Sequence, residues 1–291
     1  MAPIAAGVRM MVAAACLAGA QVAPEHLALA RIKLRMSENL ERLPNYTCTE
    51  TIERSTRRAG SRRFQLLDTM RLEVALVEGL ELFAWPGAGR FEDREIKDFA
   101  PSGGAIGNGN FALHARAVFL GRAPVFQFAG EENLNGRAML RYDFKVAQVL
   151  SGFEVRVGAT AAVVGYHGSF WADPRTDEVA RLELRASDIP PNLDLKEVSD
   201  TMDYSRLRIG ESDFLLPTAS EMTMIDMRGN LNRNRIQFSG CRQYAGRSLV
   251  TFEEPPPAPD APEPAPRAIE LPADLPLTVE LTSTIESGRS A

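Results

Sequence analysis

The spacing of apolar residues changes from a helical period to a strand period near residue 45. From residue 24 to 43, apolar side chains recur every three or four positions, at Leu29, Ile32, Met36, Leu40 and Leu43. Pro24 suits a first helical turn, and Pro44 cannot continue a helix. We expect an amphipathic helix over residues 24–43 whose apolar stripe packs on a sheet.

From Tyr46 onward, apolar and polar residues alternate with the period of two that is typical of half-buried strands. One long strand face carries Phe64, Leu66, Met70, Leu72, Val74 and Leu76, broken only by Asp68. Further strands are expected at 80–86, 138–147, 152–157, 161–172, 178–186, 196–208, 212–225, 231–244 and 247–253. Short turns such as Asn135-Gly136 join them, which indicates antiparallel neighbours. The pattern predicts an α+β fold built on a long, curled antiparallel β-meander, a half-barrel.

One segment interrupts the meander. Residues 93–99 could form a helical turn, and Ser102–Asn110 is a glycine-rich loop. A second helix is expected over Asn110–Leu120, with Asn110 as its cap and Gly121 at its exit. Its inward residues would be Phe111, Ala115, Val118 and Phe119. We expect this segment to form a helical flap across one face of the sheet.

The N-terminus has the features of an export signal. Residues 10–18 are an apolar run behind Arg9, and Ala18-Gly19-Ala20 supplies the small residues that a signal peptidase reads. We expect a signal peptide over 1–20 and an exported, periplasmic or cell-envelope protein. A weak lipobox ending at Cys16 is the alternative, in which Cys16 would be lipidated. After residue 20 no apolar run reaches the roughly 18–20 residues of a membrane-spanning helix.

The composition changes abruptly after the meander. We therefore expect a half-barrel domain over 21–254, followed by a proline-rich linker over 255–267. Residues 268–291 contain one more alternating stretch, which is either a C-terminal strand or the start of a second module. A lone strand cannot bury its own face, so this stretch needs a partner surface.

Two cysteines remain after the signal peptide, Cys48 and Cys241. In an oxidising compartment an even pair predicts a disulfide, with two separate buried thiols as the alternative. The loop it closes would contain about 194 residues, for which chain entropy gives roughly 5 kcal/mol as an upper figure. Strict alternation places Cys241 on the wrong strand face, so burial of both cysteines requires a bulge at Ser239-Gly240.

The chain offers little for catalysis, metals or nucleic acid. Its net charge of −5 gives no bulk attraction to nucleic acid or anionic membranes. Its three histidines, His26, His114 and His167, have no partner at ligand spacing. His167 beside Tyr166 could act as a general base, although a structural role fits it better. The sequence therefore predicts no enzyme, no catalytic residue, no cofactor and no metal.

The aromatic residues fall in pairs along the expected strands and flap. Phe83 and Trp85 share one strand face, and Phe126 and Phe128 share another. With Phe111 and Phe119 of the flap helix, they are the candidates for lining an apolar chamber inside a curled sheet. Ordinary core packing is the alternative explanation for all six.

The order of these elements, with the hairpin Trp171-Ala172-Asp173-Pro174-Arg175-Thr176 after them, resembles the outer-membrane lipoprotein carrier and sorting proteins (LolA-like). The resemblance covers about residues 24–253. It implies an incomplete barrel with helices in its mouth that binds a lipid or lipoprotein acyl chain. Two alternatives stay open: an envelope protein–protein interaction or sensor domain with a filled core, and a secreted hydrolase on a β-sandwich.

Overall fold

The computed structural model describes residues 22–88, 91, 99, 111–158 and 160–244. The chain divides into two units, Met1–Gly246 and Arg247–Ala291, and all described residues belong to the first. The expected signal peptide, the proline-rich linker and the strands expected at 247–253 and within 268–291 lie outside the described residues. They stay predictions.

Two helices, two short 3-10 turns and twelve strands make up the described part. The helices are α1 (Pro24–Arg42) and α2 (Leu113–Phe119), and the 3-10 turns are η2 (Gln148–Leu150) and η3 (Pro191–Leu193). The strands are β1 (Tyr46–Arg57), β2 (Gln65–Val77), β3 (Leu80–Ala84), β4 (Val125–Leu134), β5 (Arg137–Val146), β6 (Glu154–Val157), β7 (Thr160–Val163), β8 (Gly165–Ala172), β9 (Val179–Ser187), β10 (Leu195–Ile209), β11 (Ser212–Asp226) and β12 (Leu231–Gln243).

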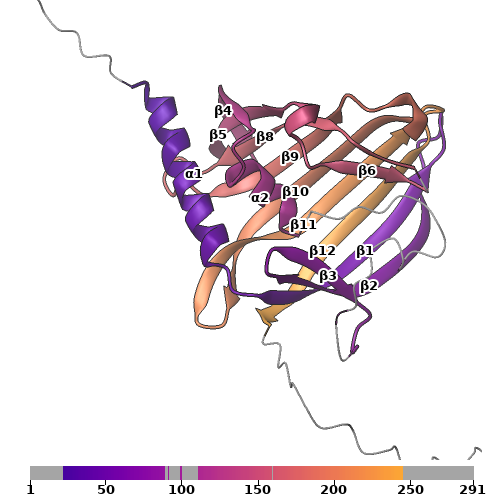
Figure 1. The fold of residues 1–291 in the computed structure, drawn as a ribbon, viewed down its shortest axis with the longest axis horizontal. Coiled ribbons are helices and arrows are strands. Elements are labelled where there is room, and N and C mark those ends of the chain that lie inside the picture. The colour runs from indigo at the N-terminus through magenta and orange to yellow at the C-terminus, as the bar shows by residue number, and fades with distance from the viewer. Residues whose placement is uncertain (1–21, 89–90, 92–98, 100–110, 159, 245–291) are drawn as a thin grey trace, which may run out of the picture. The chain divides into compact units, whose positions relative to one another are not determined.

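Ten strands form one antiparallel sheet in the order β3-β2-β1-β12-β11-β10-β9-β8-β5-β4 (Figure 1). The first strand, β1, pairs with the last, β12, so the two ends of the meander meet in its middle. The edges are therefore β3 and β4, and the connection between them, which contains α2, links one edge to the other. The sheet does not close into a barrel, which confirms the predicted half-barrel meander.

One face of this sheet, the inner face, is lined by a continuous row of side chains. Adjacent partners in the register run Phe128, Tyr142, Phe170, Leu182, Met202, Ser220, Ile236, Ile52 and Met70, from β4 to β2. Ser220 is the only polar member. Because successive side chains of a strand point to opposite faces, this row identifies the apolar side of the whole sheet.

Helix α1 confirms the predicted stripe and packs on this inner face. Its buried residues are Ala28, Ile32, Met36 and Leu40. Asn39 donates to the Leu215 carbonyl at 2.9 Å and accepts from the Leu215 amide at 2.8 Å, so the helix is joined to β11 by a paired hydrogen bond. Arg31 and Arg35 on its exposed side pair with Asp177 and Glu178.

The second helix is shorter than predicted. It begins at Leu113 rather than at Asn110, which lies outside the described residues. Glu81 of β3 accepts from the amides of Ala112 and Leu113 at 2.8 and 3.2 Å, so a distant carboxylate satisfies the first amides. The predicted inward residues Phe111, Ala115, Val118 and Phe119 are all buried.

The prediction of a single strand over 161–172 is wrong. This segment divides into β7, which pairs with β6 in a separate two-stranded sheet, and β8, which belongs to the main sheet. The break is at Val164, whose side chain is buried and whose amide donates to the Phe153 carbonyl at 2.9 Å. Apolar residues continue through the break, so the alternation gives no sign that the chain changes partners.

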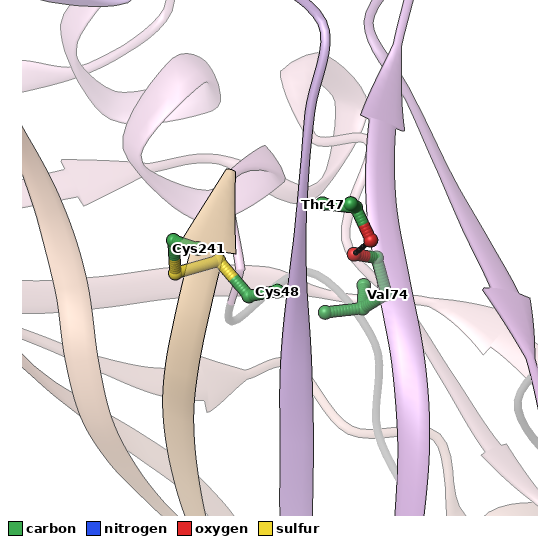
Figure 2. The surroundings of a disulfide bond; sticks show 4 residues. All are labelled: Thr47, Cys48, Val74 and Cys241. Carbon is green, nitrogen blue, oxygen red and sulfur yellow. Dashed lines mark hydrogen bonds between the residues drawn. A yellow bond between two sulfur atoms is a disulfide. The ribbon is translucent and has the colours of Figure 1, made fainter. Parts of the chain in front are cut away.

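The predicted disulfide is confirmed. Cys48 of β1 and Cys241 of β12 are bonded, with their Cα atoms 4.1 Å apart (Figure 2). Thr49 pairs with Ser239 and Thr47 with Arg242, so Gly240 and Cys241 together oppose Cys48. Gly240 has a φ of +59°, which only glycine adopts readily, and it forms the predicted bulge. Cys48 is buried, whereas Cys241 is half-buried.

Candidate functional site

The inner face carries two large apolar clusters, and a third, smaller one lies where Val198, Met222 and Met224 of β10 and β11 meet Val155 of β6. The first, the helix-covered half, comprises buried residues of α1, α2, β5, β8, β9 and β10, with Leu215 of β11. The second, the disulfide half, comprises buried residues of β1, β2, β3 and β12, with Phe99, Phe111 and three residues where β10 and β11 meet: Ile209, Phe214 and Leu216. The face is therefore apolar on both sides, but different elements cover each side.

The structure separates the six aromatic candidates. Phe119, Phe126 and Phe128 belong to the helix-covered half. Phe83 and Phe111 are buried in the disulfide half. Trp85 follows β3, is 48% exposed, and its ring lies 5.2 Å from that of Phe99. The six do not converge on a single cluster, and their role in lining a ligand stays a prediction.

Aromatic rings fill the helix-covered half. The rings of Tyr142 and Phe170 are stacked with centroids 5.2 Å apart. Phe119 of α2 and Phe128 of β4 meet them edge-on or tilted, at 5.2 and 5.1 Å respectively. The Tyr142 hydroxyl donates to the Glu25 carbonyl of α1 at 2.7 Å. Ring contacts therefore join the sheet to α2, and the Tyr142 hydroxyl joins it to α1.

Beside the apolar row, the next row of inner-face residues becomes polar in the disulfide half. It passes from Asp200 through Met222 and Asn234 to Arg54 and Asp68. Arg54 is only 1% exposed, and its Nε donates to Asp68 Oδ1 at 2.7 Å. A buried guanidinium needs such a partner, because an unpaired buried charge is very costly. The break at Asp68 in the strand pattern was the only sequence signal of this ion pair.

Glu50 of β1 is a second buried polar group of this half. It is 3% exposed, and its neighbours in the register are Leu72 and Phe238. Among the residues that the structure describes, its Oε2 has no hydrogen-bond partner. Burial, with the nearby charge of Glu81 as the smaller cause, raises the pKa of Glu50 to about 8. Its carboxyl is therefore mostly neutral at pH 7. No sequence pattern singled out this residue.

A buried histidine–carboxylate pair bears on the hydrolase alternative. His114 of α2 lies with Nε2 3.4 Å from Asp200 Oδ2, and this Nε2 makes no hydrogen bond within the described part of the chain. Ser220 donates to Asp200 Oδ1 at 2.9 Å. In a catalytic triad the imidazole lies between hydroxyl and carboxylate, whereas here the carboxylate lies between the other two. In this arrangement the Ser220 hydroxyl donates to the carboxylate and not to the imidazole, which differs from a triad. His26 and His167 are both exposed.

Two cavities are formed by described residues. One, of about 140 Å³, lies between α1 and the sheet and is lined mainly by charged residues such as Arg35, Glu178 and Arg206. The other, of about 440 Å³, crosses β9 to β12 and is lined by residues such as Arg181, Asp203 and Arg235. None of the six aromatic candidates lines either cavity.

The described residues contain no group of three or more His, Cys, Asp or Glu side chains that could hold a metal ion. They also contain no helix that is long and apolar enough to cross a membrane.

No protein-family model and no curated protein sequence matches the chain. Solved structures do match. One is described as an outer membrane lipoprotein-sorting protein domain from Vibrio parahaemolyticus, with 14% identity, a TM-score of 0.41, and 76% of this chain and 95% of that chain covered. A DUF1329 family protein from Desulfovibrio piger matches with 11% identity and a TM-score of 0.40, and the match covers 78% of this chain and 96% of that chain.

A third match is the lipoprotein LppX from Mycobacterium tuberculosis, with 8% identity and a TM-score of 0.25, covering 77% of this chain and 99% of that chain. All three TM-scores lie below 0.5, so we transfer no ligand or activity from these proteins. The matched structures include a protein of the lipoprotein-sorting class that the sequence resembles.

Proposed function

We propose that this chain is an exported, non-enzymatic protein that binds a lipid or lipoprotein acyl chain on the inner face of its sheet. One observation carries the proposal: the row of inner-face residues from Phe128 to Met70 is apolar except at Ser220, on a sheet that does not close. An open sheet with such a face needs a cover. In the helix-covered half that cover is made of α1 and α2, which share no strand pairing with the sheet.

A covering helix that moves aside would offer apolar area to a chain-like ligand. Helix α2 has only seven residues, and its polar ties include the two amides on Glu81 and the Arg116 guanidinium on the Leu40 carbonyl at 3.3 Å. Each buried methylene of an acyl chain contributes about 0.8 kcal/mol, so a long chain can offset the ring contacts that α2 loses.

Binding of a fluorescent fatty acid to the full mature chain tests this proposal. Phe126→Ser and Phe128→Ser alter half-buried rings on the edge strand β4, where a substitution should cost the fold little stability. We expect each to weaken binding at least about tenfold, because a ring contributes more than 1.4 kcal/mol of apolar burial. Leu80→Ser, at a side chain that is 64% exposed, is the matched control and should bind normally.

The interaction or sensor domain with a filled core is the second candidate. The same rings support it. The Phe170 ring already packs against the rings of Phe119 and Tyr142, each with its centroid 5.2 Å away, so these rings need no ligand to cover them. If the wild-type chain binds no acyl probe, and native mass spectrometry of protein from its own host finds no lipid, this second function replaces the first.

A further inference from the structure

Two turns far apart in the sequence meet at one end of the sheet. They are the β1–β2 turn, residues 58–64, and the β11–β12 turn, residues 227–230 (Figure 1). The Ala59 amide donates to Asn230 Oδ1 at 3.1 Å, and Arg57 pairs with Leu231 in the register. The contact makes one continuous surface from both hairpins.

Six arginines gather on this surface, which we name the arginine end: Arg57, Arg58, Arg62, Arg63, Arg228 and Arg233. None of the six guanidinium groups has a carboxylate oxygen within 4.0 Å in the part of the chain that the structure describes. Elsewhere on the sheet, exposed arginines such as Arg185 and Arg235 are paired with carboxylates. The arginine end is therefore a local concentration of unpaired positive charge on a chain whose net charge is −5.

Carboxylates at this end do not cancel that charge. Asp226 lies in the β11–β12 turn, but it accepts from the amides of Arg228 and Asn230 and from the Asn230 side chain. The pKa of Asp226 is lowered, first by its hydrogen bond with the Asn230 side chain. Asp194 lies beside the same turn, where its carbonyl accepts from the Met227 amide at 3.1 Å. Within the described residues neither aspartate makes an ion pair with one of the six guanidinium groups, although the charge of Arg228 also lowers the pKa of Asp226.

Large apolar side chains are exposed among the arginines. Phe64 is 37%, Leu66 59%, Leu67 46% and Met227 63% exposed. The Arg233 guanidinium lies 3.6 Å from the centroid of the Phe64 ring, with Arg57 at 5.4 Å. A ring held between cations stays at the surface instead of folding back into the core. Neither a nucleic acid nor a soluble polyanion needs such an apolar set.

We infer that the arginine end docks on a bilayer surface that contains anionic phospholipid. Guanidinium groups bind phosphate through two parallel N–H donors, and leucine, methionine and phenylalanine side chains enter the boundary between headgroups and acyl chains. The charge complementarity is local, because the chain as a whole is acidic. This docking is independent of what the inner face binds.

Vesicle co-sedimentation of the full mature chain tests the inference. The vesicles contain equal parts of phosphatidylglycerol and phosphatidylcholine, and pure phosphatidylcholine is the comparison. We expect binding only to the anionic vesicles, with the bound fraction falling as salt is added. Equal binding to both vesicles, or binding to neither, overturns the inference.

Two variants and one control locate the contact. Arg58→Gln/Arg62→Gln/Arg63→Gln alters exposed turn residues and should weaken vesicle binding about a hundredfold, because each basic residue at an anionic surface contributes roughly fivefold. The control Arg42→Gln/Arg71→Gln/Arg122→Gln removes the same charge from exposed positions elsewhere and should bind as the wild type does. Equal loss in both overturns a local site.

The second variant, Leu66→Ser/Leu67→Ser, separates a membrane from a soluble polyanion. We expect it to weaken vesicle binding at least about tenfold while leaving any retention on a heparin column unchanged. If it binds vesicles normally, the arginine end recognises anions alone and docking on a bilayer is rejected.

Discussion

The two halves of the inner face use the same strand pattern but are held together in different ways. In the helix-covered half, stacked rings such as Tyr142 and Phe170 meet side chains from α1 and α2. In the disulfide half, a covalent bond joins β1 to β12, and buried polar groups such as Glu50 and Arg54 interrupt the apolar surface. One half is covered by helices that share no strand pairing with the sheet, and the other half is fixed by a bond between two of its strands.

Under the proposed function the two halves have separate tasks. Helices that share no strand pairing with the sheet would expose and cover the apolar face without breaking that pairing. The disulfide would keep β1 and β12 paired meanwhile, because these strands are neighbours only through tertiary pairing. The predictions that follow perturb one half at a time, from the largest expected effect to the smallest.

Removing the disulfide should have the largest effect. Cys48→Ala/Cys241→Ala should lower the free energy of unfolding by about 2–5 kcal/mol, because it frees a very long loop in the unfolded chain. Denaturant unfolding measures the loss, and hydrogen exchange should report it first in β1 and β12. Reductant should destabilise the wild type and leave the double variant unchanged. Equal stability of the two proteins would show that strand pairing alone holds this half.

Glu50 should make the disulfide half sensitive to pH. Its pKa is about 8 in the folded chain against 4.5 for the free side chain, because burial disfavours the charged form. Between these values the unfolded state loses the proton and the folded state keeps it. The contribution of Glu50 to the free energy of unfolding should therefore be most favourable below about pH 4.5. It should fall by up to about 4 kcal/mol as the pH rises to 8.

Unfolding curves of Glu50→Gln at several pH values check this. The variant should lose most of the fall in stability between pH 5 and 8. Glu53→Gln, at an exposed position on the same strand, should keep the wild-type profile. A profile of Glu50→Gln that matches the wild type would mean that Glu50 is not the group responsible.

Gly168→Ala should destabilise the helix-covered half. A Cβ at Gly168 would lie 1.9 Å from the Glu183 carbonyl oxygen and 2.8 Å from the Phe144 ring, so strand β8 would have to shift. We expect a loss of about 1–3 kcal/mol in thermal or denaturant unfolding, as for other overpacked cores. Gly152→Ala is the control, since nothing lies within 4 Å of its Cβ. Similar stability of both variants would contradict tight packing at β8.

The ion pairs of α1 should contribute least. Glu178 accepts from Arg35 at 3.1 Å and from Arg206; burial opposes ionisation, but these hydrogen bonds outweigh it and lower the pKa of Glu178. Arg35→Gln should cost less than about 1 kcal/mol, with the difference from wild type disappearing at high salt. Arg42→Gln is the control. A larger loss of stability that does not depend on salt would mean that Arg35 stabilises α1 by packing and not through its ion pair with Glu178.

The sequence by itself determined the features that depend on neighbouring residues. The stripe from Leu29 to Leu43 predicted α1 to within one residue of its end, because helical spacing is a local property. The bulge at Gly240 also followed from local alternation, since only an inserted residue could turn Cys241 toward Cys48. The antiparallel meander followed from short turns between strands.

Only the tertiary structure decided which strands and side chains meet. Alternation is the same in β7 and β8, so the change of sheet at Val164 left no trace in the pattern. The burial of Glu50 beside Phe238 and the hydrogen bond from the Ala59 amide to Asn230 both depend on the pairing of β1 with β12. The period of a strand predicts which face of the sheet a residue occupies. Its neighbours on that face depend on which strands pair, and these strands are far apart in the sequence.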